Sequence, residues 1–324
     1  MGRFDQRIGY KSSTVGAGYF RNRMDNARQR RNTLPWVLMI VLALIWGSSF
    51  ILMKRGLFQD GRPALSPLQL AAARIIIAWA VLSPVLFRHG RFLRTHWRPL
   101  LATGLLGNGI PAILFATAQS RIDSSLSGML NSLTPLMTLL AGILFFREPM
   151  RGGHFIGIAL GLLGAVGLIL LKDTDDHTTW SLFAVMPILG TICYGLSGNI
   201  VKRHLHDVPP VAISALALSF LAPPFIALGW ITGIPGTVAG DPAAWHALGY
   251  VALLATLSSA LALVLWNMLL HRVSAVRASS VTYLMPVVAI GWGALDGEYV
   301  GPGRLAMIAV ILSGVYVVHL AEHR

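Results

Sequence analysis

The sequence predicts an all-α integral membrane protein with ten transmembrane helices in two inverted five-helix repeats. Of its 324 residues, 55% are hydrophobic and 12% are charged, which is more apolar surface than a soluble domain of this length can cover. Apolar segments of membrane-spanning length recur along the chain. Motifs of the first half also return in the second half. These three observations place the chain among the polytopic membrane proteins.

Ten segments have the length and composition of membrane spans. A spanning helix needs roughly 20 mostly apolar residues. Most connections between the segments are short, so neighbouring helices are expected to run antiparallel and to pack directly. Division of the chain at charged residues, prolines and glycines gives the spans 35–55, 66–87, 99–119, 124–146, 153–171, 179–200, 209–231, 244–270, 277–295 and 302–320.

The distribution of positive charge predicts the orientation of these spans. Lys and Arg are concentrated on the cytoplasmic side of membrane proteins. Of the 26 Lys and Arg residues, 19 fall in the two termini and in the loops after the second, fourth, sixth and eighth spans, and 6 fall in the other loops. Both termini are therefore expected to be cytoplasmic, in a multi-pass protein of a bacterial-type inner (plasma) membrane.

Residues 1–34 form a basic segment without an apolar face. This composition is typical of a disordered, solvated cytoplasmic tail, and adsorption to anionic lipid is the alternative. Met24 is an alternative start, so whether residues 1–23 belong to the natural protein stays open. The net charge of +13 does not indicate nucleic-acid binding, because topology accounts for its placement and no basic, aromatic-interleaved face remains.

The two halves of the chain carry the same motifs. An aromatic-Gly-x-Ser-x4-Lys-Arg motif begins at Trp46 in the first span and again at Tyr194 in the sixth, 148 residues later. At an offset of 151 residues, Pro135 in the fourth span matches Pro286 in the ninth. Each copy holds five spans, an odd number, so the second copy enters the membrane in the opposite sense. We expect repeats over 35–172 and 173–324, with a substrate site near the midplane between them.

Three segments resemble the EamA branch of the drug/metabolite transporter superfamily. They are the run from Ile45 to Phe50, the run from Pro135 to Glu148 and the run from Ala278 to Pro286. The resemblance covers about residues 36–320, and it departs from the family pattern at Asp296–Glu298, where an apolar residue and Gly usually precede the Glu. It implies an exporter of amino acids or related small metabolites, in some members aromatic amino acids or cationic drugs. A multidrug or organic-cation exporter of the same family is therefore the alternative.

Polar and aromatic residues at matched positions in both halves mark a candidate substrate site. The fourth span presents Asn131 and Pro135 on a face of small and polar residues, and the ninth span repeats that face with Thr282 and Pro286. Such faces also serve tight helix packing, but Asn131 and Tyr283 are larger than packing needs. The set lacks a fixed charge, which suits a neutral or zwitterionic solute. The predicted substrate-binding residues are Trp46, Ser49, Asn108, Asn131, Thr134, Tyr194, Ser197, Ser258, Trp266, Thr282 and Tyr283.

Prolines and charges within the spans bear on the mechanism. Pro135 and Pro286 each remove a backbone donor, so they are either hinges or gates for alternating access, or static kinks. Arg74 lies about 12 Å into the second span, and we expect it to reach the outer interface with Asp123 as one partner, while contact with the substrate is the alternative. Every Asp and Glu falls in a tail, a loop or a span end. Because no carboxylate is expected at the midplane to couple transport to protons, the sequence agrees with facilitated export at least as well as with antiport.

Other classes of function lack their motifs in this sequence. An intramembrane enzyme needs a nucleophile with a base or a metal cluster, and no HExxH, G-x-S-x-G or Gly-rich phosphate loop is present. A membrane receptor or scaffold is expected to carry a substantial soluble domain or a long loop, and this sequence contains neither. We therefore expect a transporter without a cofactor or metal, whose partners are a small-molecule substrate and membrane lipid. The choice between monomer and homodimer stays open.

Overall fold

The computed structural model describes residues 13–150, 152–171 and 182–322. Within these residues the chain is helical apart from turns and a short antiparallel hairpin, β1 (Phe58–Gln59) and β2 (Arg62–Pro63). The first half contains α1 (Ser13–Leu57), α2 (Pro67–Leu82), η1 (Ser83–Val85), α3 (Leu86–His89), α4 (Arg91–Thr95), α5 (Trp97–Gly104), η2 (Leu105–Gly109), α6 (Ile110–Gln119), α7 (Ser124–Asn131), α8 (Thr134–Phe146) and α9 (Gly152–Leu170). The second half contains η3 (Leu182–Ala184), α10 (Val185–His204), α11 (Pro210–Ile231), α12 (Ile234–Gly240), α13 (Pro242–Leu254), η4 (Ala255–Leu261), α14 (Ala262–Leu270), α15 (Ala275–Ser279), η5 (Ser280–Tyr283), α16 (Met285–Leu295) and α17 (Pro302–Glu322).

Each of the ten predicted spans corresponds to a helical segment of the structure. Among the described residues, eight segments are long and apolar enough to cross a membrane: Leu34–Leu57, Pro67–His89, Trp97–Gln119, Ser124–Phe146, Gly152–Leu170, Pro210–Ile231, Pro242–Leu270 and Ala275–Leu295. A shorter apolar helix, Pro302–Val318, lies within α17. The sixth span is α10, which is less apolar because it contains Asn199 and ends in Lys202, Arg203 and His204.

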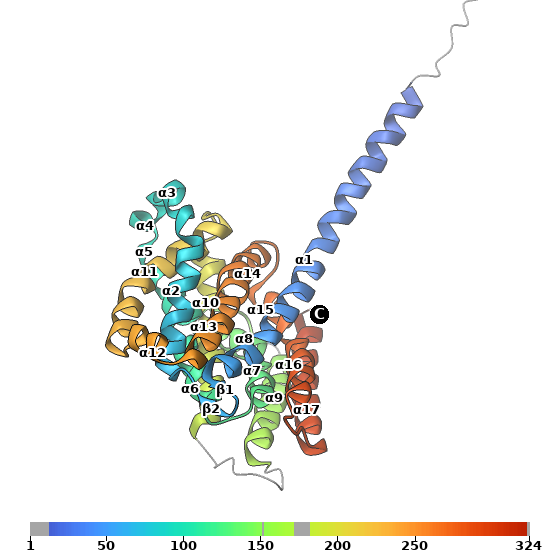
Figure 1. Ribbon diagram of the computed structural model, residues 1–324. Coiled ribbons are helices and arrows are strands. Elements are labelled where there is room, and N and C mark those ends of the chain that lie inside the picture. The colour runs from blue at the N-terminus through green and yellow to red at the C-terminus, as the bar shows by residue number, and fades with distance from the viewer. Residues whose placement is uncertain (1–12, 151, 172–181, 323–324) are drawn as a thin grey trace, which may run out of the picture.

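The packing of the helices follows the duplication of the sequence. α1 packs against α13, α14 and α16, and its counterpart α10 packs against α5, α6 and α8, which occupy the equivalent places in the other half. α2 packs on its own counterpart α11, and α9 packs on α17. Figure 1 shows α9 and α17 side by side at one edge of the bundle. Each of these helices thus packs against helices of the other half, and its counterpart does the same in reverse. A two-fold axis between two inverted five-helix halves produces this arrangement.

Irregular helix geometry also occurs at matched places in the two halves. The third and eighth spans each contain a π-helical stretch, η2 and η4. The fourth span breaks between α7 and α8, and the ninth passes through the 3₁₀ turn η5 before α16. Pro135 and Pro286 stand in the first turns of α8 and α16, where a missing N–H is harmless. Both prolines therefore begin a new helical segment inside a span.

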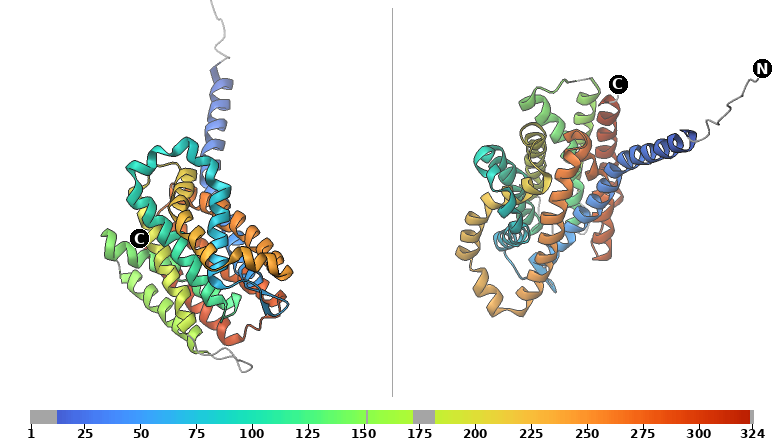
Figure 2. Two further views of the ribbon diagram at one scale, coloured as in Figure 1. Left: turned by 60° about the vertical axis from the view of Figure 1, so that its left-hand side comes forward. Right: turned by 90° about the horizontal axis from the view of Figure 1, so that it is seen from above.

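The N-terminal segment belongs to α1 over the part that is described. α1 begins at Ser13 and runs through Pro35 into the first span, and Figures 1 and 2 show it projecting from the bundle. Extension of an existing helix fixes one residue for each hydrogen bond gained, so the anchored span removes the cost of nucleation. Residues 1–12 and the expected junction at 172–173 lie outside the described residues.

Candidate substrate site

The glycine of the repeated motif allows a close approach between the two halves. A Cβ atom at Gly47 would lie 2.5 Å from Cβ of Val288 on α16, and one at Gly195 would lie 2.7 Å from the backbone nitrogen of Thr138 on α8. No side chain larger than a hydrogen fits at these distances unless the helices separate. The aromatic and Ser positions of the motif are three residues apart and so share one face of the helix. In both copies that face is turned to the space between the halves.

A central cavity of about 90 Å³ lies in this space. Its volume is of the order of the roughly 150 Å³ engineered cavity that holds benzene in another protein. Ten of the eleven predicted substrate-binding residues line it. The complete lining is Trp46, Ser49, Phe50, Met53, Arg74, Thr103, Gly107, Asn108, Phe115, Asn131, Thr134, Tyr194, Ser197, Val201, Ser258, Leu263, Trp266, Asn267, Thr282 and Met285.

The remaining predicted residues do not line this cavity. Tyr283 faces a separate groove that is bordered by Trp36, Arg277 and Tyr316. The 3₁₀ turn η5 explains the difference, because three residues per turn rotate side chains away from their positions on an α-helix. Pro135 and Pro286 lie next to lining residues along the chain without belonging to the lining.

Aromatic side chains form two walls of the cavity. The rings of Trp46 and Trp266 are tilted to each other with their centroids 5.5 Å apart, and those of Phe115 and Tyr194 are stacked at 5.9 Å. The indole nitrogen of Trp46 donates a 3.1 Å hydrogen bond to the backbone oxygen of Ser258, inside the π-helical stretch η4. This bond fixes the orientation of the indole. The walls offer apolar ring faces and edges of the kind on which an aromatic or branched apolar group packs.

The hydroxyl groups of the cavity present mainly acceptor oxygens. Ser49 donates to the backbone oxygen of Trp46 at 2.5 Å, Thr134 to that of Asn131 at 2.7 Å and Thr282 to that of Ser279 at 2.9 Å. A hydroxyl has one proton and two lone pairs. Because the protons are used within the helices, the lone pairs are what these side chains offer to a solute.

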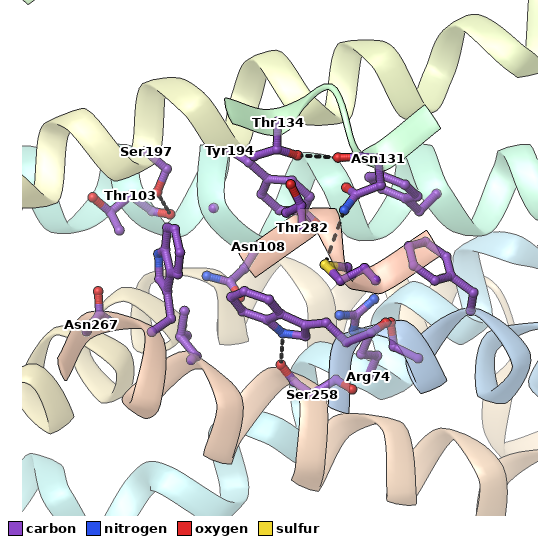
Figure 3. Close-up of a pocket in the computed structure, with 18 of the residues that line it drawn as sticks. Arg74, Thr103, Asn108, Asn131, Thr134, Tyr194, Ser197, Ser258, Asn267 and Thr282 are labelled. Atoms are coloured by element: carbon purple, nitrogen blue, oxygen red, sulfur yellow. Dashed lines mark hydrogen bonds between the residues drawn. The ribbon is translucent and has the colours of Figure 1, made fainter. Parts of the chain in front are cut away.

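Four buried polar atoms that line the cavity have no hydrogen-bond partner in the described part of the chain. They are Oγ1 of Thr103, Nδ2 of Asn108, Oδ1 of Asn131 and Oδ1 of Asn267. Such an atom costs about 1–3 kcal/mol unless water or a ligand meets it. Figure 3 shows that Asn131 lies toward one end of the pocket, whereas Thr103, Ser197 and Asn267 lie toward the other.

Thr103 and Asn267 are lining residues that the sequence comparison of the halves did not reveal. In the sequence repeat, at an offset of 151 residues, the position equivalent to Thr103 is Leu254 and the position equivalent to Asn267 is Ala116. The repeat therefore contains no signal for them. Only their depth within an apolar span, which is unfavourable for a polar side chain, could have marked them.

Arg74 corrects the expectation of a cavity without a fixed charge. It does not reach the interface toward Asp123. Its side chain lines the central cavity (Figure 3). Its Nε donates a 2.6 Å hydrogen bond to Oγ of Ser259 on η4. Asp123 instead accepts a 3.1 Å bond from Arg304 on α17. The bundle supplies Arg74 with a polar wall at its own depth, so the side chain does not have to extend to the membrane surface.

An ion cluster joins the halves at one end of the bundle. Nζ of Lys54 lies 2.6 Å from Oδ2 of Asp296 and 2.8 Å from Oε1 of Glu298, and Arg55 also contacts Asp296. Glu298 further accepts hydrogen bonds from the backbone nitrogens of Ser124 and Ser125, at 3.0 and 2.9 Å, at the start of α7. Burial favours the neutral acid, but the bonds from Lys54, Ser125 and Ser124 outweigh it and lower the pKa of Glu298 to about 2. We call this group the Lys54 cluster.

The equivalent groups at the opposite end are apart. By the repeat, Lys202 corresponds to Lys54, Glu148 to Glu298, and the start of α15 to the start of α7. Nζ of Lys202 donates to the backbone oxygen of Leu270 at 2.9 Å. Among the described residues no ion pair joins Lys202 to Glu148. Instead both line a cleft of about 320 Å³ that also borders Ala275. We call it the Lys202 cleft.

The described residues contain no group of three or more His, Cys, Asp or Glu side chains arranged to hold a metal ion. The chemistry available in the central cavity is hydrogen bonding, ring stacking and one positive charge. Groups of this kind are suited to contacts with a small polar or aromatic solute.

Comparisons with known proteins agree with the duplicated fold. Residues 34–170 and 179–320 each match the EamA-like transporter family. The chain is 27% identical to a probable amino-acid metabolite efflux pump of Escherichia coli K12 over 87% of its own length and 93% of the relative's. It is also 27% identical to an uncharacterized inner membrane transporter of the same strain, over 90% and 93%. A solved crystal structure matches with a TM-score of 0.58 and 19% identity, covering 88% of this chain and 96% of that one. At this identity the structural match establishes the fold alone.

Proposed function

Because the chain belongs to the EamA-like transporter family, we propose that it exports amino acids, neutral or aromatic, or closely related metabolites from the cytoplasm by alternating access. The protein is a membrane transporter and not an enzyme. The main support for this substrate class is the central cavity, which has two aromatic walls and buried polar atoms without a hydrogen-bond partner in the described residues. The relatives named as amino-acid metabolite efflux pumps support the same class.

The location and orientation form part of the proposal. The relative named as an inner membrane transporter supports an inner-membrane location. The excess of Lys and Arg on the side of the termini supports cytoplasmic N and C termini. In this orientation the Lys202 cleft opens toward the cytoplasm, and the Lys54 cluster lies at the outer face.

The difference between the two ends supports alternating access. Lys54 and Glu298 are in contact, while Lys202 and Glu148 line a common cleft without an ion pair between them in the described residues. In an inverted repeat each half can adopt the conformation of the other, which exchanges the two ends. We infer that the described conformation faces inward. In the outward-facing conformation Lys202 pairs with Glu148, and the Lys54 cluster is broken. The breaks at Pro135 and Pro286 supply the hinges for this exchange.

The organic-cation alternative is disfavoured by the charge of the cavity. Arg74 places a permanent positive charge in the lining. Among the described residues no Asp or Glu belongs to that lining. A cationic solute would therefore be repelled where it has to bind.

Counterflow in proteoliposomes tests the proposed function. Purified protein is reconstituted with each member of a panel of neutral amino acids, aromatic amino acids, organic cations and nucleotide sugars inside the vesicles, and uptake of labelled solute is followed. We expect saturable exchange of neutral or aromatic amino acids and none in protein-free vesicles. Saturable exchange of organic cations or nucleotide sugars alone, or chemical conversion of a solute without flux, would refute the proposal.

A further inference from the structure

The guanidinium group of Arg74 has more hydrogen-bond donors than the protein uses. Arginine carries five N–H donors, and the single hydrogen bond of Arg74 within the described chain runs from Nε to Ser259. The two terminal nitrogens form the fork that matches a carboxylate. Figure 3 shows the Arg74 side chain among the lining side chains, in the same part of the pocket as Asn131. The fork is thus held by its Nε bond and left free for a solute.

No carboxylate of the described chain balances the charge of Arg74. Asp296 and Glu298 are engaged by Lys54, and Asp123 is engaged by Arg304. A cation at this depth of a membrane protein is costly unless a partner or water compensates it. An anionic group brought by the solute would remove that cost at the moment of binding.

The other polar groups of the lining indicate what the remainder of a solute meets. Nδ2 of Asn108 is a buried donor without a partner, so it can donate to an acceptor atom of the solute. Oδ1 of Asn131 and the hydroxyls of Ser49 and Thr282 are acceptors, which suit an ammonium group or a hydroxyl. The rings of Trp46 and Trp266 suit the apolar remainder.

We propose that Arg74 is the anchor for the carboxylate of the transported solute, and that the protein is selective for monocarboxylates. The proposal rests on the proposed function and adds the group that is recognised. An ammonium group meets only neutral acceptors in the cavity, so it contributes less than the carboxylate, which gains charge-assisted bonds. The amino group is therefore dispensable, and the carboxylate is essential.

The order of binding within a set of analogues follows from this assignment. Within a series of probes that share one side chain, we expect the amino acid to bind best and the analogue without the amino group to bind almost as well. The amide and the amine, which lack the carboxylate, should bind poorly. The probes are phenylalanine, 3-phenylpropionate, phenylalanine amide and phenethylamine, with the leucine and alanine series beside them. Loss of the carboxylate should weaken binding about 30-fold or more. Loss of the amino group should weaken it less than about 5-fold.

Binding is measured directly, apart from transport. The melting temperature of purified wild-type protein in detergent is followed against the concentration of each probe, because a ligand of the folded state raises it. Counterflow of the same probes gives the transport readout. If carboxylates bind without flux, the role of Arg74 as carboxylate anchor is supported and the proposed transport function is refuted. If flux occurs but amines bind and exchange as well as carboxylates, the role of Arg74 is refuted and the proposed transport function is supported.

Variants of Arg74 complete the test. Arg74→Gln should raise the KM for phenylalanine and 3-phenylpropionate about 30-fold or more and leave phenethylamine unchanged or improved. Arg74→Lys keeps the charge without the fork, so it should raise the KM for carboxylates about 3- to 10-fold and still exclude amines. Arg62→Gln, which removes an exposed charge from the β1–β2 hairpin, is the matched control and should behave as wild type.

The wild-type analogue series and Arg74→Lys keep the proposal testable if Arg74→Gln does not fold. Three results would overturn it. The first is wild-type affinity for carboxylates in Arg74→Gln. The second is equal binding of phenethylamine and phenylalanine by the wild type. The third is the absence of binding by every carboxylate probe at about 10 mM.

Discussion

Glu298, on the turn after α16, accepts a 2.8 Å hydrogen bond from Nζ of Lys54 near the end of α1. This contact joins the two halves at one end of the central cavity. The backbone nitrogens of Ser124 and Ser125 bind the same carboxylate, so a third helix, α7, is held by it as well. Its equivalent Glu148 lines a cleft together with Lys202. The asymmetry between these two glutamates provides the structural basis for a gate.

Removal of the Glu298 charge should open the Lys54 end. Loss of one partner of a buried ion pair costs about 3–5 kcal/mol, and the side chain of Glu298 is only 3% exposed. In a Cys193→Ser background, Ser49→Cys reports on access to the cavity. We expect Glu298→Gln to increase the reaction of this cysteine with an impermeant thiol reagent from the outer side by about 10-fold or more.

Asp60→Asn is the control for that experiment, since Asp60 is an exposed carboxylate in the turn of the hairpin at the same end. It should leave the reaction rate unchanged. Equal rates in wild type and Glu298→Gln would contradict the role of the Lys54 cluster as a gate.

Acid should weaken the Lys54 cluster only at low pH. The pKa of Glu298 is lowered from 4.5 to about 2, so its contribution to stability is complete above about pH 4.5 and is lost as the pH falls through about 2. The difference in Tm between wild type and Glu298→Gln should therefore be constant from about pH 5 to about pH 8 and should shrink below about pH 4. A difference that disappears between about pH 6 and 5 would show that another group titrates.

Gly195 should tolerate no side chain. A Cβ there would lie 2.7 Å from the nitrogen of Thr138 and 2.8 Å from the backbone of Met137, which forces α10 away from α8. Gly195→Ala should lower stability by about 1–3 kcal/mol, measured as a lower Tm in detergent. Gly249→Ala on α13, where a Cβ meets nothing within 4 Å, is the control and should be neutral or slightly stabilising. A neutral Gly195→Ala would refute the close approach of the two halves.

Pro135 and Pro286 should matter for turnover and not for assembly. Each begins a helical segment inside a span, and Ala would restore a backbone donor and favour a continuous helix. The double variant Pro135→Ala, Pro286→Ala should insert normally and exchange amino acids several-fold more slowly. Pro242→Ala, at the first turn of α13, serves as control. Wild-type turnover in the double variant would remove the hinge role.

The aromatic wall should set the preference among side chains. The Trp46 and Trp266 rings lie 5.5 Å apart at the cavity surface. Trp266→Ala removes one of them, so the KM for phenylalanine should rise about 10-fold and that for alanine should change little. Counterflow competition between the two amino acids gives both values. Equal effects on both would point to a general loss of packing.

The duplication made much of the fold and of the cavity lining predictable. The copies of the motif at Trp46 and Tyr194 predicted two inverted repeats with a site between them, and the two glycines allow the close approach of the halves beside that site. Ten of the eleven predicted residues line one cavity for this reason. A two-fold relation propagates from a few matched positions to all helices, because each half has to pack against an inverted copy of itself.

Features without a counterpart in the other half escaped prediction. The position equivalent to Arg74 in the second repeat is Phe225, at an offset of 151 residues. The repeat therefore gives no signal for Arg74, whose position in the lining depends on its hydrogen bond to Ser259 on η4. Tyr283 was misplaced because η5 departs from α-helical periodicity. The helical extension of α1 to Ser13 reflects propagation from the anchored span, which local composition does not reveal.

A paired distance measurement tests the exchange of the two ends most directly. Spin labels are placed in a Cys193→Ser background on the β1–β2 hairpin and α16 for the Lys54 end, and on α8 and α15 for the Lys202 end. Addition of a transported amino acid should lengthen the first distance and shorten the second in the same molecules. Two distances that both stay fixed, or that lengthen together, in a protein that exchanges the amino acid would contradict alternating access between two inverted halves.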